Sequence, residues 1–239
     1  MTHAVPLREQ GTWSEQLIAE GELLARKPKD VGWAEAAAFP VPALTAAQSL
    51  REVTATTADG LLLVNGAGGV TGGIITALAR VRGTRVIATA GPTSTERLKR
   101  LGVETVYDYH DHDWPHAVLA RTHGAGVSAA INAARGGEPA TLSAVADGGR
   151  FATITGAPPK PERGVSIVDV YVHADGEQLQ ELAGMLGRRE LEVQIAAVYP
   201  LTCAADALAL VTHRGASGAV VLQPNLPPSF GSDETGVTR

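Results

Sequence analysis

The chain has 239 residues, of which 44% are hydrophobic and 19% are charged, with a formal net charge of −5. These values are ordinary for a globular protein with a sizeable core, and the negative balance gives no electrostatic support to a nucleic-acid or anionic-membrane partner. The single cysteine, Cys203, excludes an intramolecular disulfide and a cysteine-based zinc site within one chain. Because there is no membrane-length apolar run and no signal-peptide pattern, we expect a cytoplasmic protein.

The N-terminal region predicts short elements that need a larger body to pack on. Residues 16–19 have a strand-like pattern, but short apolar segments of this kind cannot form a core by themselves. The alanine-rich stretch 31–53 is typical of helix and is interrupted by Pro40 and Pro42. We therefore expect a helix that ends before Pro40, a bend, and a second helix over 44–53.

The stretch 61–73 predicts a strand, a glycine-rich turn and a helix. An apolar strand at 61–64 precedes the turn, and apolar residues recur at helical spacing after it. In a dinucleotide-binding sheet, glycines at this point let the backbone approach a pyrophosphate, and the helix N-terminus holds its charge. The spacing is a variant of G-x-G-x-x-G, and a plain tight turn is the alternative. The residues expected to contact a cofactor here are Gly66, Gly68, Gly69, Val70, Thr71 and Gly72.

Strands and helices alternate along the rest of the chain. The predicted strands are 85–89, 103–107, 127–131, 150–155 and 165–172, and the predicted helices are 96–101, 114–122, 138–146 and 176–186. Thr93 and Glu96 form a capping-box pattern before the first of these helices. A strand over 193–199, a helix over 203–212 and a strand over 219–223 follow, and 224–239 has the composition of a disordered tail. The fold class is therefore α/β, with a doubly wound parallel sheet covered on both faces.

Several segments read together resemble the medium-chain dehydrogenase/reductase superfamily, on its zinc-free, quinone-oxidoreductase-like branch. The matching segments are the glycine turn and residues 11–15 (GTWSE), 24–28 (LARKP), 35–46 (EAAAFPVPALTA), 85–90 (RVIATA), 148–151 (GGRF), 175–179 (DGEQL) and 218–222 (GAVVL). They occur in the family's order from about residue 7 to residue 224. The resemblance implies a Rossmann domain with remnants of a GroES-like catalytic domain at both ends.

The resemblance also divides the chain. It implies a catalytic-domain remnant at 1–30, a Rossmann dinucleotide-binding domain at 31–192, a return segment at 193–223 and a tail at 224–239. Most of the family's GroES-like domain, which supplies much of the substrate pocket, has no counterpart here. A cropped gene product, a pocket completed by another subunit, and a trimmed relative with a new use are three open explanations.

The residues after the second predicted strand favour NADPH over NADH. NAD-specific sheets place an acidic residue there to bind the ribose hydroxyls, whereas this chain has Thr89 and no acid. Thr93, Ser94 and Arg97 follow and suit a 2′-phosphate. The alternative is that Thr93 is a helix cap and Arg97 a solvated helix residue.

Further cofactor contacts are expected at three positions. The resemblance implies that Thr45 is near the nicotinamide and that Asn132 follows the fourth strand at the carboxyl edge of the sheet, where ligands bind. Thr155 lies in the segment that ends the fifth predicted strand on the same edge. A buried helix threonine and a turn residue are the plainer interpretations of Thr45 and Asn132. Ala219 replaces the family's usual lysine in the closing motif, so one cationic cofactor contact is missing. No catalytic residue and no zinc ligand can be assigned.

Two other stretches suggest partners. The run 109–113 with His116 is rich in histidine, and a solvated loop is favoured over a metal site because ligands must converge in space. The stretch 165–172 is a long β-prone segment, and an unpaired apolar edge would risk aggregation. In the resembling family this edge strand pairs with its copy, which implies a homodimer.

The sequence therefore supports two functions. The first is an NADPH-dependent reductase, in truncated form, that transfers hydride to a quinone or an α,β-unsaturated carbonyl, a small-molecule substrate. The second is a non-redox truncated relative that binds another ligand or acts as a partner subunit in a biosynthetic pathway.

Overall fold

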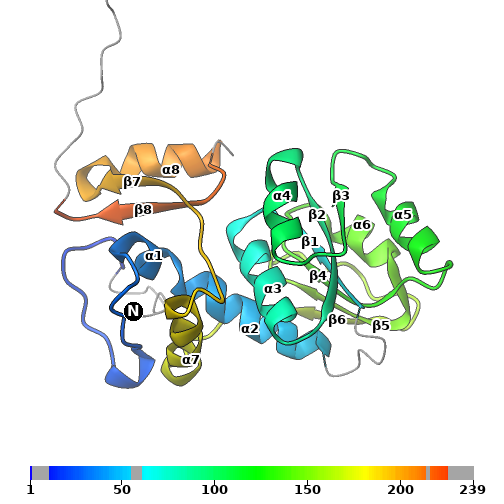
Figure 1. Cartoon of the computed structure of the whole chain (residues 1–239), viewed down its shortest axis with the longest axis horizontal. Helices are drawn as coiled ribbons and strands as arrows, with labels where there is room; N and C mark the ends of the chain where they lie inside the picture. The colour runs from blue at the N-terminus through cyan, green and yellow to red at the C-terminus, as the bar shows by residue number, and fades with distance from the viewer. Residues whose placement is uncertain (2–10, 55–60, 214–215, 226–239) are drawn as a thin grey trace, which may run out of the picture.

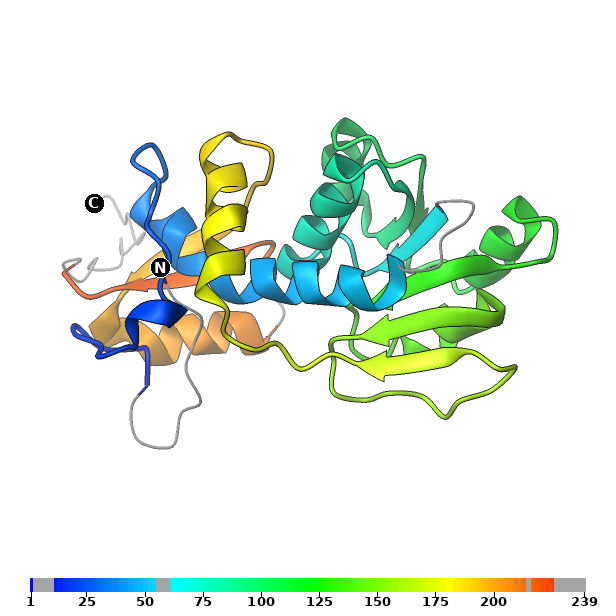
Figure 2. The same ribbon diagram turned by 90° about the horizontal axis from the view of Figure 1, so that it is seen from below.

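The computed structural model describes residue 1 and residues 11–54, 61–213 and 216–225. Figures 1 and 2 show an elongated molecule with two parts. The larger part surrounds a parallel sheet, and the smaller part holds the N-terminus together with the C-terminal strands. Helix α2 (Pro40–Thr54) runs between the two parts (Figure 2). None of the described helices is long and apolar enough to cross a membrane.

The larger part is built on a six-stranded sheet in the order β3-β2-β1-β4-β5-β6, with every neighbouring pair parallel. Its strands are β1 (Leu61–Asn65), β2 (Arg85–Ala90), β3 (Thr105–Asp108), β4 (Val127–Asn132), β5 (Val145–Thr153) and β6 (Ser166–Asp169). The strand order reverses between β1 and β4, so ligands of such sheets bind at the carboxyl ends of these two strands. The predicted α/β class and doubly wound parallel sheet are confirmed.

Helices cover both faces of this sheet. Figure 1 shows α3 (Val70–Val81) and α4 (Pro92–Arg100) on one face and α5 (Trp114–Arg121) and α6 (Glu138–Ser143) on the other. Successive residues of β1 pack into different cores, because side chains alternate along a strand: Leu62 lies in the core under α2 and α3, and Leu63 in the core under α5 and α6. A strand buried on both faces needs a continuous apolar run, and residues 61–64 supply it.

The smaller part combines elements from both ends of the chain. It contains η1 (Gly21–Leu23), α1 (Trp33–Ala38), α7 (Gly176–Gly187), β7 (Ile195–Pro200), η2 (Leu201–Cys203), α8 (Ala204–Thr212) and β8 (Ala219–Gln223). β7 and β8 form a two-stranded parallel sheet, which α1 contacts. The predicted division of the chain into domains at residues 30 and 192 stays a prediction. The tail from residue 226 lies outside the described residues.

Prolines and glycines explain two helix starts that the sequence analysis placed wrongly. Helix α2 begins at Pro40 rather than residue 44, because a proline in the first turn removes only N–H groups that no helix bond needs. Helix α4 begins at Pro92 rather than 96, with Gly91 as its N-cap and no side-chain cap bond. The capping box of Thr93 and Glu96 is therefore wrong, since Thr93 lies inside the first turn.

Other boundaries also differ from the predictions. Residues 16–19 form no strand, and β6 covers only Ser166–Asp169 of the expected 165–172. The chain leaves the sheet edge after Val170, whose N–H still donates to the Thr153 carbonyl at 2.8 Å. β5 ends at Thr153, so Thr155 follows the strand instead of ending it.

Candidate dinucleotide-binding site

The glycine turn between β1 and α3 is closed by backbone contacts that tolerate no side chain. Gly66 has φ +82°, and a Cβ added at Gly72 would lie 2.2 Å from the Gly66 carbonyl oxygen. The Gly69 N–H donates to the Gly66 carbonyl at 3.1 Å. Helix α3 therefore starts in direct contact with the end of β1, as it does in dinucleotide-binding sheets.

The start of α3 leaves backbone donors for an anion. The first bond of the helix ladder runs from the Gly73 N–H to the Gly69 carbonyl at 2.9 Å. The N–H groups of Val70, Thr71 and Gly72 precede this bond and have no acceptor within the helix. Together with the positive end of a twelve-residue helix, these donors fit the diphosphate of a dinucleotide.

Two of the three residues predicted for a 2′-phosphate lie against this turn. The Arg97 guanidinium donates from Nη2 to the Gly68 carbonyl at 2.9 Å. A Cβ added at Gly68 would lie 3.1 Å from Ser94 Oγ. Burial lowers the pKa of Arg97 from its ordinary value, while the Glu192 carboxylate opposes this change. Arg97 is therefore no solvated helix residue, whereas Thr93 is exposed in the first turn of α4.

A row of polar side chains crosses the carboxyl edge of the sheet on the face that α6 covers. Asn65 of β1 is the register partner of Asn132 of β4, which is the partner of Thr153 of β5. Thr89 occupies the corresponding level of β2, since Val64 pairs with Ala88 one residue earlier. All four side chains are buried among apolar strands, so their polar groups need partners inside the protein.

The first half of this row ties the glycine turn to the sheet. The Gly66 N–H donates to Thr89 Oγ1 at 3.0 Å, and the Thr89 hydroxyl donates to Asn65 Oδ1. Asn65 Nδ2 then donates to Asn132 Oδ1 and to Thr141 Oγ1, each at 2.8 Å. The first glycine of the turn is thus held by a hydroxyl and an amide that the sequence analysis did not connect.

The second half of the row ends on a buried carboxylate. Asn132 Nδ2 donates to Thr153 Oγ1 at 3.4 Å, and Thr153 Oγ1 lies 2.8 Å from Thr155 Oγ1. The Thr155 hydroxyl donates to Glu138 Oε1 at 2.5 Å. Every donor then points the same way, from the Gly66 N–H to Glu138, and bonds in such a chain polarise one another.

The buried polar row gives two of the predicted site residues a supporting role. The side chains of Thr89 and Asn132 are committed to partners inside the protein, so they can support the turn without reaching a ligand. Their contact with a cofactor stays a prediction, as does that of Thr155. The sequence analysis did not identify Asn65 and Glu138, because neither an asparagine at the end of a strand nor a glutamate before a proline belongs to a known sequence motif. The strand register places Asn65 beside Asn132, and the position of α6 brings Glu138 to Thr155.

The described contacts of Thr45 are those of a buried helix threonine, the plainer of its two interpretations. Its hydroxyl donates to the Val41 carbonyl at 2.7 Å within α2, and its carbonyl accepts from Ser49 Oγ at 2.6 Å. The side chain is buried. A contact with the nicotinamide is still only a prediction from the resemblance.

In the histidine-rich segment after β3, His110 of the loop and His116 of α5 each lie beside one aspartate. His110 Nδ1 lies 2.6 Å from Asp108 Oδ1, and His116 Nδ1 lies 2.6 Å from Asp113 Oδ1. Within the described ranges, no group of three or more His, Cys, Asp or Glu side chains is placed to hold a metal ion. The loop from Tyr109 to Asp113 is exposed, and the absence of a metal site stays a prediction.

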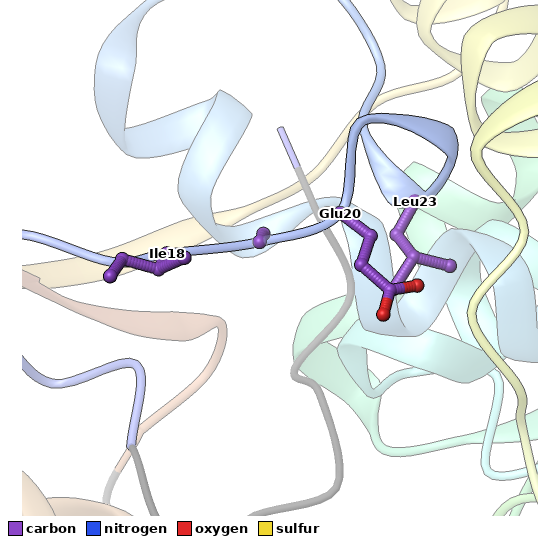
Figure 3. Close-up of a pocket in the computed structure, with 4 residues that line it drawn as sticks. Ile18, Glu20 and Leu23 are labelled. Carbon is purple, nitrogen blue, oxygen red and sulfur yellow. The ribbon is translucent and has the colours of Figure 1, made fainter.

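Two hollows lie in the smaller part, and their lining includes no residue of the glycine turn. One is lined by Ile18, Ala19, Glu20 and Leu23, and Figure 3 shows its side chains on the segment before and within η1. The other is lined by Trp33, Ala34, Ala37, Val221, Leu222, Gln223, Pro224 and Asn225. The dinucleotide site is therefore defined by the backbone geometry of the glycine turn and of the start of α3.

The sheet order, the glycine turn and the helix start together define the class of dinucleotide-binding α/β proteins. A family model described as zinc-binding dehydrogenase matches residues 101–222, just over half of the chain. The chain belongs to this family, the medium-chain dehydrogenases/reductases.

Similar proteins include a large synthase and separate oxidoreductases. The phthioceranic/hydroxyphthioceranic acid synthase of Mycobacterium tuberculosis (strain ATCC 25618 / H37Rv) is 30% identical over 240 residues, covering 92% of this chain and 11% of the synthase. The chloroplast envelope quinone oxidoreductase homolog of Arabidopsis thaliana is 27% identical over 229 residues, covering 90% of this chain and 69% of the homolog.

Among solved structures, an NAD-dependent alcohol dehydrogenase is 30% identical with a TM-score of 0.79, covering 89% of this chain and 65% of that one. Mycobacterial Rv1454c complexed with NADPH is 27% identical with a TM-score of 0.72, covering 84% of this chain and 67% of that one. This chain thus spans about a tenth of the synthase and about two thirds of these structures.

Proposed function

We propose that the chain is the dinucleotide-binding part of an NADPH-dependent oxidoreductase that reduces a quinone or an α,β-unsaturated carbonyl. The observation that carries the proposal is the closed glycine turn beside the Arg97 guanidinium, with three N–H groups of α3 that have no backbone acceptor among the described residues. The names of similar proteins agree with it, since they include an NADPH-dependent alkenal/one oxidoreductase of Arabidopsis thaliana and a structure complexed with NADPH. Bound NADPH supplies the hydride.

The protein groups have separate roles in this proposal. The N–H groups of Val70, Thr71 and Gly72 hold the diphosphate, and Ser94 and Arg97 hold the 2′-phosphate. The buried polar row keeps the turn and the carboxyl edge of the sheet in one arrangement, so that the cofactor meets donors that need no reorganisation. The residues that touch the substrate are not assigned.

The exposed apolar surface of the smaller part leads to a second element of the proposal. Trp33 is 78% exposed and Ile18 is 87% exposed, although both belong to apolar residue types that usually pack. We propose that a further segment or partner covers this surface and completes the substrate pocket. The chain spans 65% of the alcohol dehydrogenase structure, so a third of that fold has no counterpart here.

We also propose a homodimer through the free edge of β6. This strand pairs only with β5, and Oδ1 of Asp169 at its end is buried without a hydrogen-bond partner in the described part of the chain. A second copy would pair the open backbone groups of the edge. Sedimentation equilibrium of the wild type and of Val168→Pro tests this, with a dimer that dissociates in the variant as the expected result.

The alternative function is a non-redox unit in a biosynthetic protein. The observation that favours it is the match of 92% of this chain to 11% of a synthase. Ala219, at the start of β8, also lacks the cation expected from the resemblance. In that case the site at the glycine turn holds another ligand, or the chain works as a partner subunit.

Calorimetry with NADPH and NADH separates the two functions. We expect NADPH to bind to the purified chain more tightly than NADH, and Arg97→Met to remove most of the difference. Lys99→Met, which removes an exposed cation from the same helix, is the matched control. If neither cofactor binds at millimolar concentration, the redox proposal fails for this chain.

A further inference from the structure

A buried carboxylate lies at the start of α6, outside the expected contacts of the cofactor. Glu138 is the first residue of this helix and is only 5% exposed. Glutamate is rarely buried to this extent unless it is paired. Its partner among the described residues is no cation but the Thr155 hydroxyl, which donates to Oε1 at 2.5 Å and forms the last bond of the buried polar row.

The two ends of this row have a fixed polarity. The Gly66 N–H can only donate, and a carboxylate can only accept. The groups between them are hydroxyls and side-chain amides, each of which can donate and accept. Because Thr89 accepts from Gly66 at one end and Thr155 donates to Glu138 at the other, the bonds between them all run in one direction. Glu138 therefore orients groups that it does not touch.

A second contact joins the start of α6 to the glycine turn. A Cβ added at Gly137, the N-cap of α6, would overlap Asn65 Nδ2 and lie 3.0 Å from Asn132 Oδ1. A Cβ added at Gly66 would lie 3.0 Å from the Ala133 carbonyl carbon. The loop between β4 and α6 thus touches both the row and the turn, so a change at the start of α6 reaches the surroundings of Gly66.

On the basis of the proposed function, we propose that Glu138 is a positioning residue for the diphosphate of the cofactor. It acts through the Thr155 hydroxyl and the rest of the row on the Gly66 N–H, and it keeps the turn in the form that presents the N–H groups of α3. NADPH and NADH share the diphosphate, so Glu138 should raise the affinity for both. Arg97, in contrast, should distinguish the two cofactors.

The test measures NADPH and NADH affinity by calorimetry in three variants. Glu138→Leu removes the acceptor, and we expect both affinities to fall about fivefold, as changes in a network that touches no ligand can do. Glu138→Gln keeps an oxygen that accepts from Thr155, so it should restore most of the affinity. Leu142→Ala is the matched control, because it truncates a buried side chain of the same helix and removes no group of the row.

A double-mutant cycle tests whether the effect passes along the row. Thr89 and Glu138 share no hydrogen-bond partner among the described residues, so independent losses would multiply to within about twofold. We expect the combined loss of affinity in Thr89→Val/Glu138→Leu to fall short of that product by at least about threefold. The reason is that either change already removes the single direction of the row.

Four results would overturn the inference and leave the proposed function intact. They are losses that multiply in the cycle, a Glu138→Leu affinity equal to that of Leu142→Ala, a Glu138→Gln affinity as low as that of Glu138→Leu, and a loss confined to NADPH. If circular dichroism shows that Glu138→Leu does not fold, Thr155→Val removes the same bond from its other side and replaces it in the cycle. A wild type that binds neither cofactor overturns both the inference and the proposed function.

Discussion

The two parts of the molecule differ in how completely they bury their apolar residues. In the larger part, Leu62, Leu63 and Phe151 have no exposed surface, and helices cover both faces of the sheet. In the smaller part, a two-stranded parallel sheet leaves Leu208 and Val211 about half exposed on α8. Parallel strands are normally buried on both faces. We infer that the larger part is stable by its own core, and that it holds the dinucleotide site. The smaller part leaves apolar surface exposed that a further segment or partner would cover.

Truncating apolar side chains to alanine should give the largest difference in stability loss between the two parts. Phe151→Ala removes a fully buried ring from the core under α5 and α6, and we expect a loss of about 3–5 kcal/mol in the free energy of unfolding. Leu208→Ala, on the exposed side of α8, should cost within about 0.5 kcal/mol. Chemical denaturation measures both. Equal losses would show that the surface of α8 is already packed in solution.

A glycine substitution should weaken cofactor binding when it is made in the larger part and not when it is made in the smaller part. Gly72→Ala places a Cβ 2.2 Å from the Gly66 carbonyl oxygen, so α3 must move away from the turn. We expect NADPH affinity to fall by at least about tenfold, which corresponds to about 1.4 kcal/mol. Gly21→Ala in η1 meets nothing within 4 Å and serves as the control. Calorimetry after a check of the circular dichroism spectrum reports the result, and normal affinity in Gly72→Ala would contradict the turn as the diphosphate site.

Breaking the polar row should have an intermediate effect. Thr89→Val keeps the shape of the side chain but leaves the half-buried Gly66 N–H without its acceptor, at a cost of about 1–3 kcal/mol in stability. Thr89→Ser keeps the hydroxyl and should restore most of the stability. Thr212→Val, which removes an exposed hydroxyl on α8, should be close to neutral. Thermal unfolding of the three variants tests the row, which loses support if Thr89→Ser is as unstable as Thr89→Val.

Removing surface ion pairs should give the smallest change in the free energy of unfolding, in either part of the molecule. Hydrogen bonds from Arg85, and then from Arg121, lower the pKa of Glu104 in the larger part, and the Gly32 N–H followed by Arg189 lowers that of Glu35 in the smaller part. A lowered folded-state pKa means that the stabilisation is present above the ordinary carboxyl pKa of 4.5 and is lost as the pH falls through the folded value.

Glu104→Gln and Glu35→Gln should therefore each cost less than about 1 kcal/mol at neutral pH and nothing in strong acid. Urea denaturation at several pH values measures this. A cost that persists in strong acid would mean that the carboxylates act through packing rather than charge.

Much of the larger part could be predicted from local sequence. The strand at 61–64 and the helix beginning at Val70 follow from apolar periodicity, and the glycines fix the turn between them. Helix starts were harder to place, because prolines such as Pro40 and Pro92 both end and begin helices. The strand predicted at 16–19 failed, since a short apolar pattern forms a strand only where a partner strand is available.

The sequence by itself determined the class of the fold, the family resemblance and the position of the glycine turn, because each depends on residues close together in the chain. Only the tertiary structure decided that Asn65, Thr89, Asn132 and Thr153 meet in one row, and that Gly137 lies against Asn65. Those contacts depend on strand order and register, which join residues far apart in sequence through the packing of whole elements. The same cause explains why Glu138 could be found only after the fold was known.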